Sequence, residues 1–399
     1  MAGEVGSTGA PPHRSARRVA ARTVGREDEP DEKGGALRKV KDLTGPGITD
    51  HLGIGGTDLG VTAVAPDGRL VAVFGDTFDR AGVGGPGWRS PVVVFGDAGS
   101  ARSGIRWTGS LGPRSDYADQ ALPYQHDSVI HGRPVSTVLP TDLITIGREM
   151  FLHVMVCQGL GNVHWTEIHR SVDNGETWQH TGATWPGDAH GGLFQMLTWE
   201  LGDDGFVYAF STGFQRDKGL ILQRVPADRI TDPAAWQGWG FRDGRWAWGN
   251  PPTVALTGAY GELCLRRVED RWLLALFNAG DYRMDVLNLD GPTANLYEAV
   301  RGTVLHGCAW GCEDHEAGHV AQLYGGYIVP GSTLDDLHLV VSQWNTERNW
   351  PYRAMQFAGT APRPGDRPLA PPPPPGEGGG PLKDALLKGA GKLAKRFLP

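Results

Sequence analysis

The chain has 399 residues, with 38 Lys and Arg against 45 Asp and Glu, a net charge of −7; it has no basic cluster in its centre, so nucleic acid is not expected as its main partner. Its 4 cysteines are too few for a disulfide scaffold, and no run of about 20 apolar residues is present to span a membrane. With 59 Gly and 29 Pro and little helical periodicity, the composition indicates many strands and turns.

The N-terminal segment, residues 1–43, is polar, charged and poor in large apolar side chains. Such a segment cannot bury enough apolar surface to offset the entropy lost on ordering, so we predict that it is disordered. It contains an Arg-rich patch, but no apolar stretch follows the patch, and no secretory signal is recognised. Export by another route, release by lysis and an intracellular location therefore all stay open.

Residues 44–360 are predicted to form one globular domain of recurring hairpins. Each repeat has two alternating strands around a short turn and then a third strand. The five repeats span 56–79 with 91–97, 142–159 with 164–178, 193–214 with 220–226, 262–278 with 282–289, and 322–345 with 352–359. Radial repetition protects sheet edges. The predicted fold class is therefore all-β: a five-bladed β-propeller, preceded by the disordered segment and followed by a C-terminal amphipathic helix.

The first repeat carries one aspartate near the outer end of each hairpin leg, Asp58 and Asp76. A three-residue turn at 66–68 places the two directly opposite each other, where like charges destabilise a strand pair and one carboxyl is pushed toward its protonated form. One acidic and one ionised carboxyl are what glycoside hydrolysis requires. The alternative is that each aspartate caps a strand end or a turn.

The stretch SVDNGETW, residues 171–178, matches the pattern of an Asp-box. Ser171 and Asp173 are predicted to bond the turn backbone, Gly175 to adopt the left-handed conformation, and Trp178 to pack beneath the hairpin. Since this role is structural, Asp173 is not a catalytic candidate.

Several stretches together resemble an actinobacterial and phage family of endo-D-arabinanases, formerly a domain of unknown function. They are GTDLG at 56–60, FGDTF at 74–78, PTDLITIG at 140–147, SVDNGETW, and, most distinctively, the block at 323–345 with YRAMQF after it. The resemblance covers about residues 45–360. It implies a five-bladed propeller that cuts α-linked D-arabinofuranose chains, and it places the family's essential aspartates on Asp58 and Asp76. The absent signal peptide and the added C-terminal tail depart from the family.

Substrate-binding candidates come from the other repeats, because a furanoside site needs aromatic faces and groups that bind hydroxyls. Core packing, strand capping and internal ion pairing (Arg283 with Asp281, for example) are the alternative interpretations. The candidates are Asp142, Gln195, Asn278, Arg283, Tyr324, Tyr327, Trp344 and Asn345.

The stretch HGCAWGCEDHEAGH, residues 306–319, contains ligand types that zinc accepts. Its spacing matches no common structural zinc site, so an ordinary loop is the favoured interpretation, and a Cys308–Cys312 bridge is a further alternative. Cys157 and Cys264 lie in apolar strand patterns and are predicted to be buried thiols. No metal and no cofactor are predicted.

Beyond the domain, residues 361–381 form a Pro/Gly-rich linker, and residues 382–399 are predicted to form a cationic amphipathic helix. Such a helix is typical of contact with a membrane surface; docking on the propeller is the alternative. Its apolar and charged positions are Leu382, Leu386, Leu393 and Phe397, with Lys383, Lys388, Lys392, Lys395 and Arg396 against Asp384.

The predicted function is hydrolysis of internal α-D-arabinofuranosyl linkages in mycobacterial-type cell-wall arabinan, as in arabinogalactan and lipoarabinomannan. The expected partner is this polysaccharide, and the expected place of action is the cell envelope. Two alternatives stay open: a non-catalytic glycan-binding propeller, such as a phage receptor-binding part, and another propeller glycosidase, such as an L-arabinanase or a sialidase.

Overall fold

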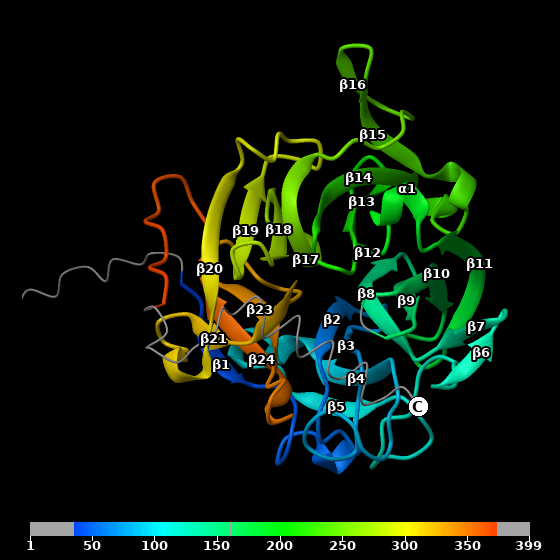
Figure 1. Ribbon diagram of the computed structural model, residues 1–399, viewed down its shortest axis with the longest axis vertical. Helices are drawn as coiled ribbons and strands as arrows, with labels where there is room; N and C mark the ends of the chain where they lie inside the picture. The colour runs from blue at the N-terminus through cyan, green and yellow to red at the C-terminus, as the bar shows by residue number, and fades with distance from the viewer. Residues whose placement is uncertain (1–35, 160, 373–399) are drawn as a thin grey trace, which may run out of the picture. The chain divides into compact units, whose positions relative to one another are not determined.

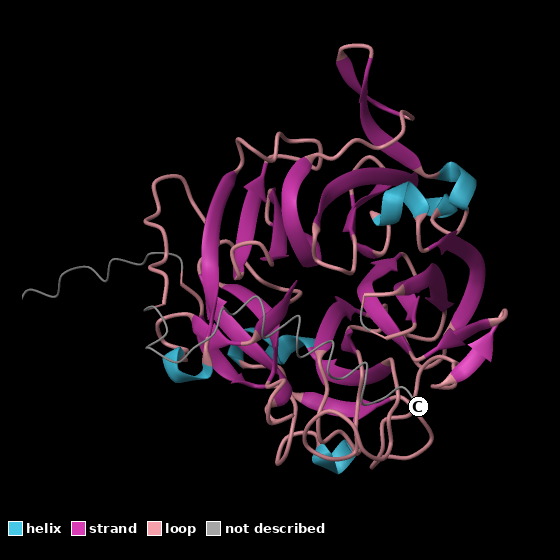
Figure 2. Ribbon diagram, in the orientation of Figure 1, coloured by secondary structure: helices cyan, strands magenta, loops and turns pink. Residues whose placement is uncertain are grey.

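The computed structural model describes residues 36–159 and 161–372, all within the compact unit Gly34–Pro399. Strands dominate this part of the chain (Figure 2), and its one α-helical element, α1 (Ala189–Gly192), has four residues. The all-β prediction is therefore confirmed. The predicted tail helix, residues 382–399, and its contact with a membrane surface lie outside the described residues. Among the residues described, no helix is long and apolar enough to cross a membrane.

Five antiparallel units follow one another along the chain (Figure 1), and the third and fourth are joined in one continuous sheet because β14 (Lys218–Pro226) also pairs with β17 (Leu256–Val268). The first two are β2 (Leu59–Val64), β3 (Arg69–Phe74), β4 (Val92–Asp97) and β5 (Trp107–Ser110), then β8 (Thr137–Ile146), β9 (Glu149–Cys157), β10 (Val163–Ser171) and β11 (Gln179–Pro186). The third is β12 (Met196–Leu201), β13 (Phe206–Thr212), β14 (Lys218–Pro226) and β15 (Gln237–Arg242), the last of which also pairs with β16 (Arg245–Trp248).

The last two units complete the order. They are β17 (Leu256–Val268), β18 (Arg271–Asn278), β19 (Arg283–Leu289) and β20 (Val300–Cys308), then β22 (Leu323–Ile328), β23 (Leu337–Trp344), β24 (Tyr352–Gly359) and β1 (Arg38–Asp42). A short hairpin of β6 (Ser128–Ile130) and β7 (Arg133–Val135) precedes the second unit, and β21 (His319–Ala321) pairs with β20.

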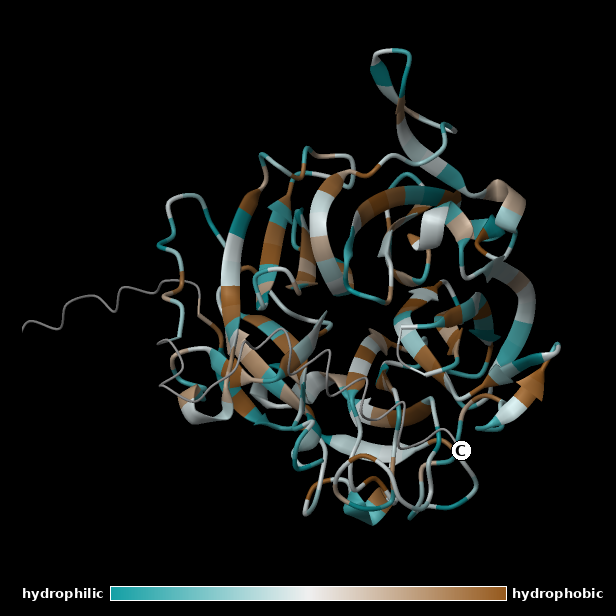
Figure 3. Cartoon of the chain, in the orientation of Figure 1, coloured by the Kyte–Doolittle hydropathy of each residue, from teal (hydrophilic) through white to brown (hydrophobic). Residues whose placement is uncertain are grey.

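The first strand of each unit contacts the first strand of the next: β2 with β8, β8 with β12, β12 with β17, β17 with β22, and β22 with β2. Figure 1 shows β2, β8, β12 and β17 around a common centre. These strands are rich in buried apolar residues, and Figure 3 shows hydrophobic stretches along them. Because both faces of these inner strands are buried, packing fixes the strands in place. The residues at the strand ends are therefore held in fixed positions too.

The predicted boundary at residue 43 is wrong for its last residues. Strand β1 pairs with β24 and adds a fourth strand to the last unit. Leu37 and Leu43, on either side of this strand, are fully buried. The local sequence RKVKD is polar, so only the pairing with a strand more than 300 residues later in the chain explains its order.

The predicted linker also differs at its beginning. Ala361 is fully buried and donates its N–H to the carbonyl of Leu334 at 2.9 Å. Further on, the carbonyl of Leu369 lies 3.1 Å from Nε2 of His306, on β20. Residues 361–372 therefore pack along the domain instead of leaving it at residue 360.

The Asp-box has the predicted geometry. Ser171 Oγ accepts the N–H of Gly175 at 2.9 Å, and Asp173 accepts the N–H of Thr177 at 2.9 Å. Gly175 has φ of 90°, and Trp178 is buried with its Nε1 donating to the Gly175 carbonyl. The motif closes the turn after β10 and takes no part in the pocket described below.

Candidate active site

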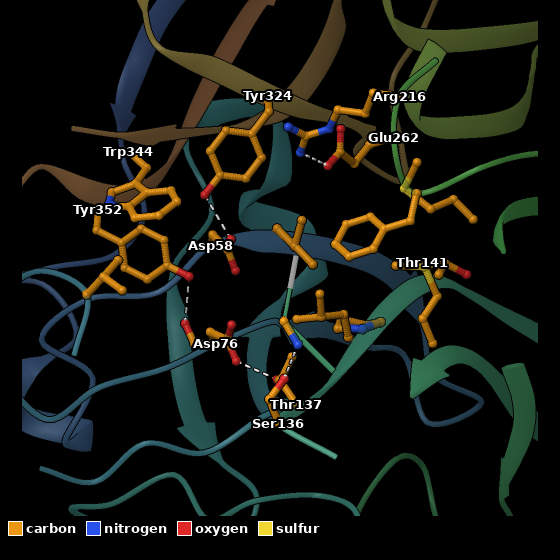
Figure 4. Close-up of a pocket in the computed structure, with 18 of the residues that line it drawn as sticks. Asp58, Asp76, Ser136, Thr137, Thr141, Arg216, Glu262, Tyr324, Trp344 and Tyr352 are labelled. Atoms are coloured by element: carbon orange, nitrogen blue, oxygen red, sulfur yellow. Dashed lines mark hydrogen bonds and ion pairs between the residues drawn. The ribbon is translucent and has the colours of Figure 1, made fainter. Parts of the chain in front are cut away.

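A cavity of about 600 Å³ lies where the inner strands meet, and side chains of all five units line it. Asp58 and Asp76 of the first unit line it, together with Tyr324, Trp344 and Tyr352 of the fifth unit (Figure 4). Pockets of this size with apolar walls and a few polar groups are typical of small-molecule sites.

The predicted register holds from Val61 to Val64 and again at the Gly56–Phe78 bridge, but it is displaced by one residue in between, so Asp58 and Asp76 do not lie directly opposite each other. The pairing shifts between Leu59 and Val61, and the Asp58 carbonyl accepts the N–H of Gly75 at 3.0 Å. Asp76 is then the extra residue before the ladder resumes at the Gly56–Phe78 bridge. Bulges of this kind re-aim side chains beside functional sites.

The first bulge contains two consecutive residues with positive φ, Leu59 at 62° and Gly60 at 107°. At the second position glycine is favoured, because a Cβ on Gly60 would lie 3.0 Å from the side chains of Phe74 and Val340. The bulge turns Asp58 toward the cavity while the rest of β2 keeps its buried positions. The second aspartate reaches the same cavity from the other leg, which is the part of the prediction that the structure supports.

Asp58 is held in an environment that favours its protonated form. Its Oδ2 accepts the hydroxyl proton of Tyr324 at 2.8 Å, whereas Oδ1 is buried and has no hydrogen-bond partner among the described residues. Burial, and next the nearby charge of Asp76, raise the pKa of Asp58 from 3.8 to about 8. The unpartnered Oδ1 is therefore the oxygen that can carry and donate a proton.

Asp76 is held differently. Its Oδ1 accepts two hydrogen bonds, from Thr137 Oγ1 at 2.6 Å and from Trp88 Nε1 at 2.8 Å. Burial raises the pKa of Asp76 above 3.8, while these two hydrogen bonds and the charge of His126 act to lower it. The charge of the partner carboxylate adds to the effect of burial at Asp58, whereas every influence on Asp76 other than burial lowers its pKa, so the last proton of the pair resides on Asp58.

The raised pKa of Asp58 predicts a pH-dependent gain in stability on replacement. Between pH 3.8 and about 8 the folded protein holds a proton on Asp58 that the unfolded chain has lost, so stability falls as pH rises through this window. Asp58→Asn does not titrate. We expect the variant to equal the wild type near pH 4 and to be more stable at pH 8 by at least about 1 kcal/mol. Urea unfolding at both pH values measures this, and equal stability at pH 8 would contradict it.

All three of the predicted aromatic residues, Tyr324, Tyr327 and Trp344, line the cavity. The two tyrosines are three positions apart on β22, which places them on opposite faces of a regular strand. A register shift between Gly325 and Tyr327 brings both to the cavity, and Gly326 is required there because a Cβ would lie 2.3 Å from the sulfur of Met284. Trp344 adds an indole Nε1 that is buried and has no partner among the described residues.

Asp142 does not reach the cavity. It is fully buried and binds Arg266 with both oxygens, at 2.6 and 2.9 Å. It also accepts from Thr198 Oγ1 at 2.7 Å and from the N–H of Trp199 at 3.0 Å. This carboxylate joins β8, β12 and β17 in the core and has no capacity left for a substrate, so the substrate-binding prediction is wrong for Asp142.

The side chains of Gln195 and Asn345 form hydrogen bonds with backbone groups and do not line the cavity. The Gln195 amide donates to the Gly187 carbonyl at 2.7 Å and accepts the N–H of Phe214 at 2.9 Å. Oδ1 of Asn345 accepts the N–H groups of Glu347 and Arg348 at 3.1 and 2.9 Å. Both residues are nearly buried, and their predicted contact with substrate is not supported.

Asn278, at the end of β18, and Arg283, at the beginning of β19, form a polar network within the fourth unit. Asn278 Nδ2 donates to Asp281 and Asp285, each at 3.1 Å, and Arg283 pairs with the same two carboxylates at 3.2 and 3.0 Å. The alternative of internal ion pairing is therefore the correct one for Arg283. Neither side chain lines the cavity.

The sequence-based reasoning missed several residues of the cavity. Glu262 begins the inner part of the fourth unit; it is 5% exposed and forms an ion pair with Arg216, whose guanidinium lies 5.3 Å from the ring of Tyr324. Thr137 and Trp88 were missed because they act only as donors to Asp76. The one available signal was the position of Glu262 at the beginning of a repeat, which matches that of Asp58. No motif marks the others.

The zinc interpretation of residues 306–319 finds no support. Within residues 36–159 and 161–372, no group of three or more His, Cys, Asp or Glu side chains could hold a metal ion. Cys308 is a buried free thiol and so forms no bridge to Cys312. Cys157 and Cys264 are buried free thiols, as predicted.

Comparisons with known proteins place this chain in a family. The family model described as "Domain of unknown function (DUF4185)" matches residues 44–358. An uncharacterized 35.9 kDa protein in the asd 3′ region of Mycolicibacterium smegmatis is 31% identical over 331 residues, 78% of this chain and 94% of that protein. Notoamide biosynthesis cluster protein J′ of Aspergillus versicolor is 30% identical over 310 residues, 74% of this chain and 82% of that protein.

Among solved structures, the chain is similar to one described as "a putative hydrolase from Bacteroides ovatus ATCC 8483". The TM-score is 0.54 at 13% identity, covering 77% of this chain and 86% of that one. At this identity the similarity concerns the fold alone. A GH43_1 enzyme from Xanthomonas citri, solved with xylotriose, has a TM-score of 0.48 at 12% identity, covering 83% and 93%; a score below 0.5 supports no conclusion about this chain.

Proposed function

The chain belongs to the family described as Domain of unknown function (DUF4185), and from the chemistry of its cavity we propose that it is a glycoside hydrolase with the architecture of a five-bladed β-propeller. One observation carries this proposal: two aspartates share a cavity, one in surroundings that keep it protonated and one accepting two hydrogen bonds as a carboxylate. Paired carboxyls with separated pKa values are the requirement of glycosidic bond hydrolysis.

The roles follow from the two environments. Asp58 donates the proton on Oδ1 to the glycosidic oxygen as the bond to the anomeric carbon breaks. Asp76 takes a proton from the water that attacks the anomeric carbon, so that one water is consumed and one new reducing end forms. In this mechanism the product has inverted anomeric configuration, which proton NMR of the first products distinguishes from retention.

The proposed substrate is the internal α-D-arabinofuranosyl linkage of mycobacterial-type cell-wall arabinan, with action at the cell envelope. The resemblance of the blocks around Asp58, Asp76 and residues 323–345 to endo-D-arabinanases supports this choice. The aromatic side chains of Tyr324, Tyr327 and Trp344 around the carboxyl pair suit the apolar faces of sugar rings.

The test is product analysis after incubation with mycobacterial arabinogalactan, with plant L-arabinan as the control polysaccharide. Short D-arabino-oligosaccharides from the first and none from the second support the proposal. Cleavage of L-arabinan alone would contradict the proposed substrate but would still show that the protein is a glycoside hydrolase. Saturable binding of arabinogalactan without new reducing ends would instead establish a glycan-binding protein.

The pair also predicts the pH dependence of cleavage. Because Asp58 acts as an acid only while protonated, and its pKa is raised to about 8, kcat/KM should fall as pH rises through about 8. At low pH kcat/KM should fall again as Asp76 takes up a proton. Measuring kcat/KM from roughly pH 4 to 10 gives both limbs of this bell-shaped profile. A rate that stays constant across the alkaline limb would contradict the role of Asp58.

A further inference from the structure

The ring of His126 lies between two oxygen atoms beside the cavity. Its Nδ1 is 2.7 Å from the carbonyl oxygen of Ser136, and its Nε2 is 3.0 Å from Oε1 of Gln120. A carbonyl oxygen only accepts hydrogen bonds, so Nδ1 must carry a proton. Whether Nε2 also carries one depends on which end of the Gln120 amide faces it.

The surroundings of Gln120 determine that orientation. Its Nε2 donates to the carbonyl of Leu122 at 2.8 Å and to that of Tyr124, while its Oε1 accepts the N–H of Ser90 at 3.2 Å. Reversing the amide would place its oxygen against two carbonyls and its NH₂ against an N–H donor. Gln120 therefore presents an acceptor to His126, and both ring nitrogens of His126 are hydrogen-bond donors.

The same ring supports both donors of Asp76. It stacks on Trp88 with ring centroids 4.3 Å apart and planes at 17°, and the indole of Trp88 donates to Asp76. Ser136, which accepts from Nδ1, directly precedes Thr137, whose hydroxyl is the second donor to Asp76. A cation over an indole face is itself a favourable contact. His126 is thus joined to Asp76 through two short routes.

A positive charge on His126 would act mainly on one neighbouring group, the carboxylate of Asp76. The titratable groups around His126 and Asp76 are Asp58, Tyr352, Cys157, Tyr124, Asp127 and Glu167. Burial raises the pKa of the Tyr352 hydroxyl well above its usual value, which keeps it neutral. Burial raises the pKa of the Cys157 thiol, which keeps it neutral, and Tyr124 donates to the buried carboxylate of Glu167. Asp127 is exposed. Among the described residues the His126 ring forms no ion pair, so its charge acts on Asp76 across the stacked indole.

From this arrangement we propose that His126 is a positioning residue held as an imidazolium, whose positive charge keeps Asp76 in the ionised form that the reaction needs. The catalytic consequence of this proposal rests on the proposed function, whereas the charge state of His126 does not. In a neutral imidazole one ring nitrogen carries a lone pair and no hydrogen. That lone pair would face the lone pair of the Ser136 or Gln120 oxygen, and neither oxygen has a hydrogen to donate.

The catalytic consequence is tested with two variants. His126→Gln removes the charge, and His126→Arg keeps a planar cation that can stack on Trp88 and donate to both oxygens. We expect the acid limb of the kcat/KM profile to move up by at least about half a pH unit in His126→Gln, and to stay at the wild-type position in His126→Arg. Equal acid limbs in all three proteins overturn the proposal, because a purely structural role changes the rate without moving the limb.

The charge state is tested without activity. In ¹⁵N-histidine-labelled protein at pH 7, where free imidazole is mostly neutral, the signal lost in His126→Gln should show two protonated ring nitrogens. Exposed His51 serves as an internal reference for an ordinary histidine. A single protonated nitrogen on His126 overturns the proposal. If no polysaccharide is cleaved, the proposed function fails on its own, and carboxyl ¹³C NMR of Asp76 in the same variants still decides whether His126 controls its ionisation.

Discussion

Replacing Asp58 or Asp76 by asparagine is expected to lower kcat/KM for arabinan cleavage by about 10²–10⁴-fold each. Asparagine preserves the shape of the side chain, but it can neither donate the proton held on Asp58 nor take one from water at Asp76. Rates measured as new reducing ends on arabinogalactan, with the fold checked by circular dichroism, give the comparison. The control is Asp228→Asn, an exposed carboxylate in the turn after β14, which is expected to leave kcat/KM unchanged.

A second substrate separates the two roles. An aryl α-D-arabinofuranoside with an acidic phenol leaving group needs little protonation, so Asp58→Asn should lose much less rate on it than on the polysaccharide. Asp76→Asn should lose rate on both substrates, because the attack of water is impaired in each case. The opposite pattern would exchange the roles of the two aspartates, and full activity of either variant would remove that residue from the mechanism.

Breaking the buried pair of Asp142 and Arg266 is expected to have the largest effect on stability. Five hydrogen bonds converge on Asp142, from Arg266 twice, Thr198, Trp199 and Leu143. Arg266→Met would leave a fully buried carboxylate without its cation, which costs about 3–5 kcal/mol. Urea unfolding measures the loss, and no change in the catalytic pKa values is expected.

The neighbouring residue provides a matched control. Arg267 pairs with Asp203, whose side chain is 83% exposed, and exposed pairs contribute about 0–1 kcal/mol. Arg267→Met should therefore be nearly neutral. The double variant Asp142→Leu with Arg266→Met should recover part of the loss, since it leaves no unpaired charge in the core. Equal stabilities of the Arg266→Met and Arg267→Met variants would show that the buried pair does not stabilise the fold.

The hairpin repeats were predictable because each depends on local signals. Alternating apolar residues and short polar turns define strands such as β2 and β3, and the Asp-box turn at 171–178 follows from side chains that bond their own backbone. The fourth strand of each unit was not predicted. Outer strands such as β11 are largely exposed, so their apolar pattern is weak, and β1 is ordered only by pairing with β24.

The candidate site was predictable in part, and the failures share a cause. Alternation assigns each strand residue to one face, and one extra residue reverses the assignment for everything beyond it. The register shifts between Pro140 and Asp142, so Thr141 lines the cavity while Asp142 points into the core. A similar shift at Gly326 places both Tyr324 and Tyr327 at the cavity.

The sequence by itself therefore determined the all-β class, the positions of the five hairpins and the presence of two aspartates on one of them, because these depend on neighbours a few residues apart. The tertiary structure alone decided which polar side chains meet at the cavity. Asp58 meets Tyr324, Asp76 meets Thr137, and Glu262 meets Arg216 only after strands from different units come together around bulges. Those contacts set the difference in protonation between Asp58 and Asp76, since burial and hydrogen bonding to the charged form are properties of the folded chain.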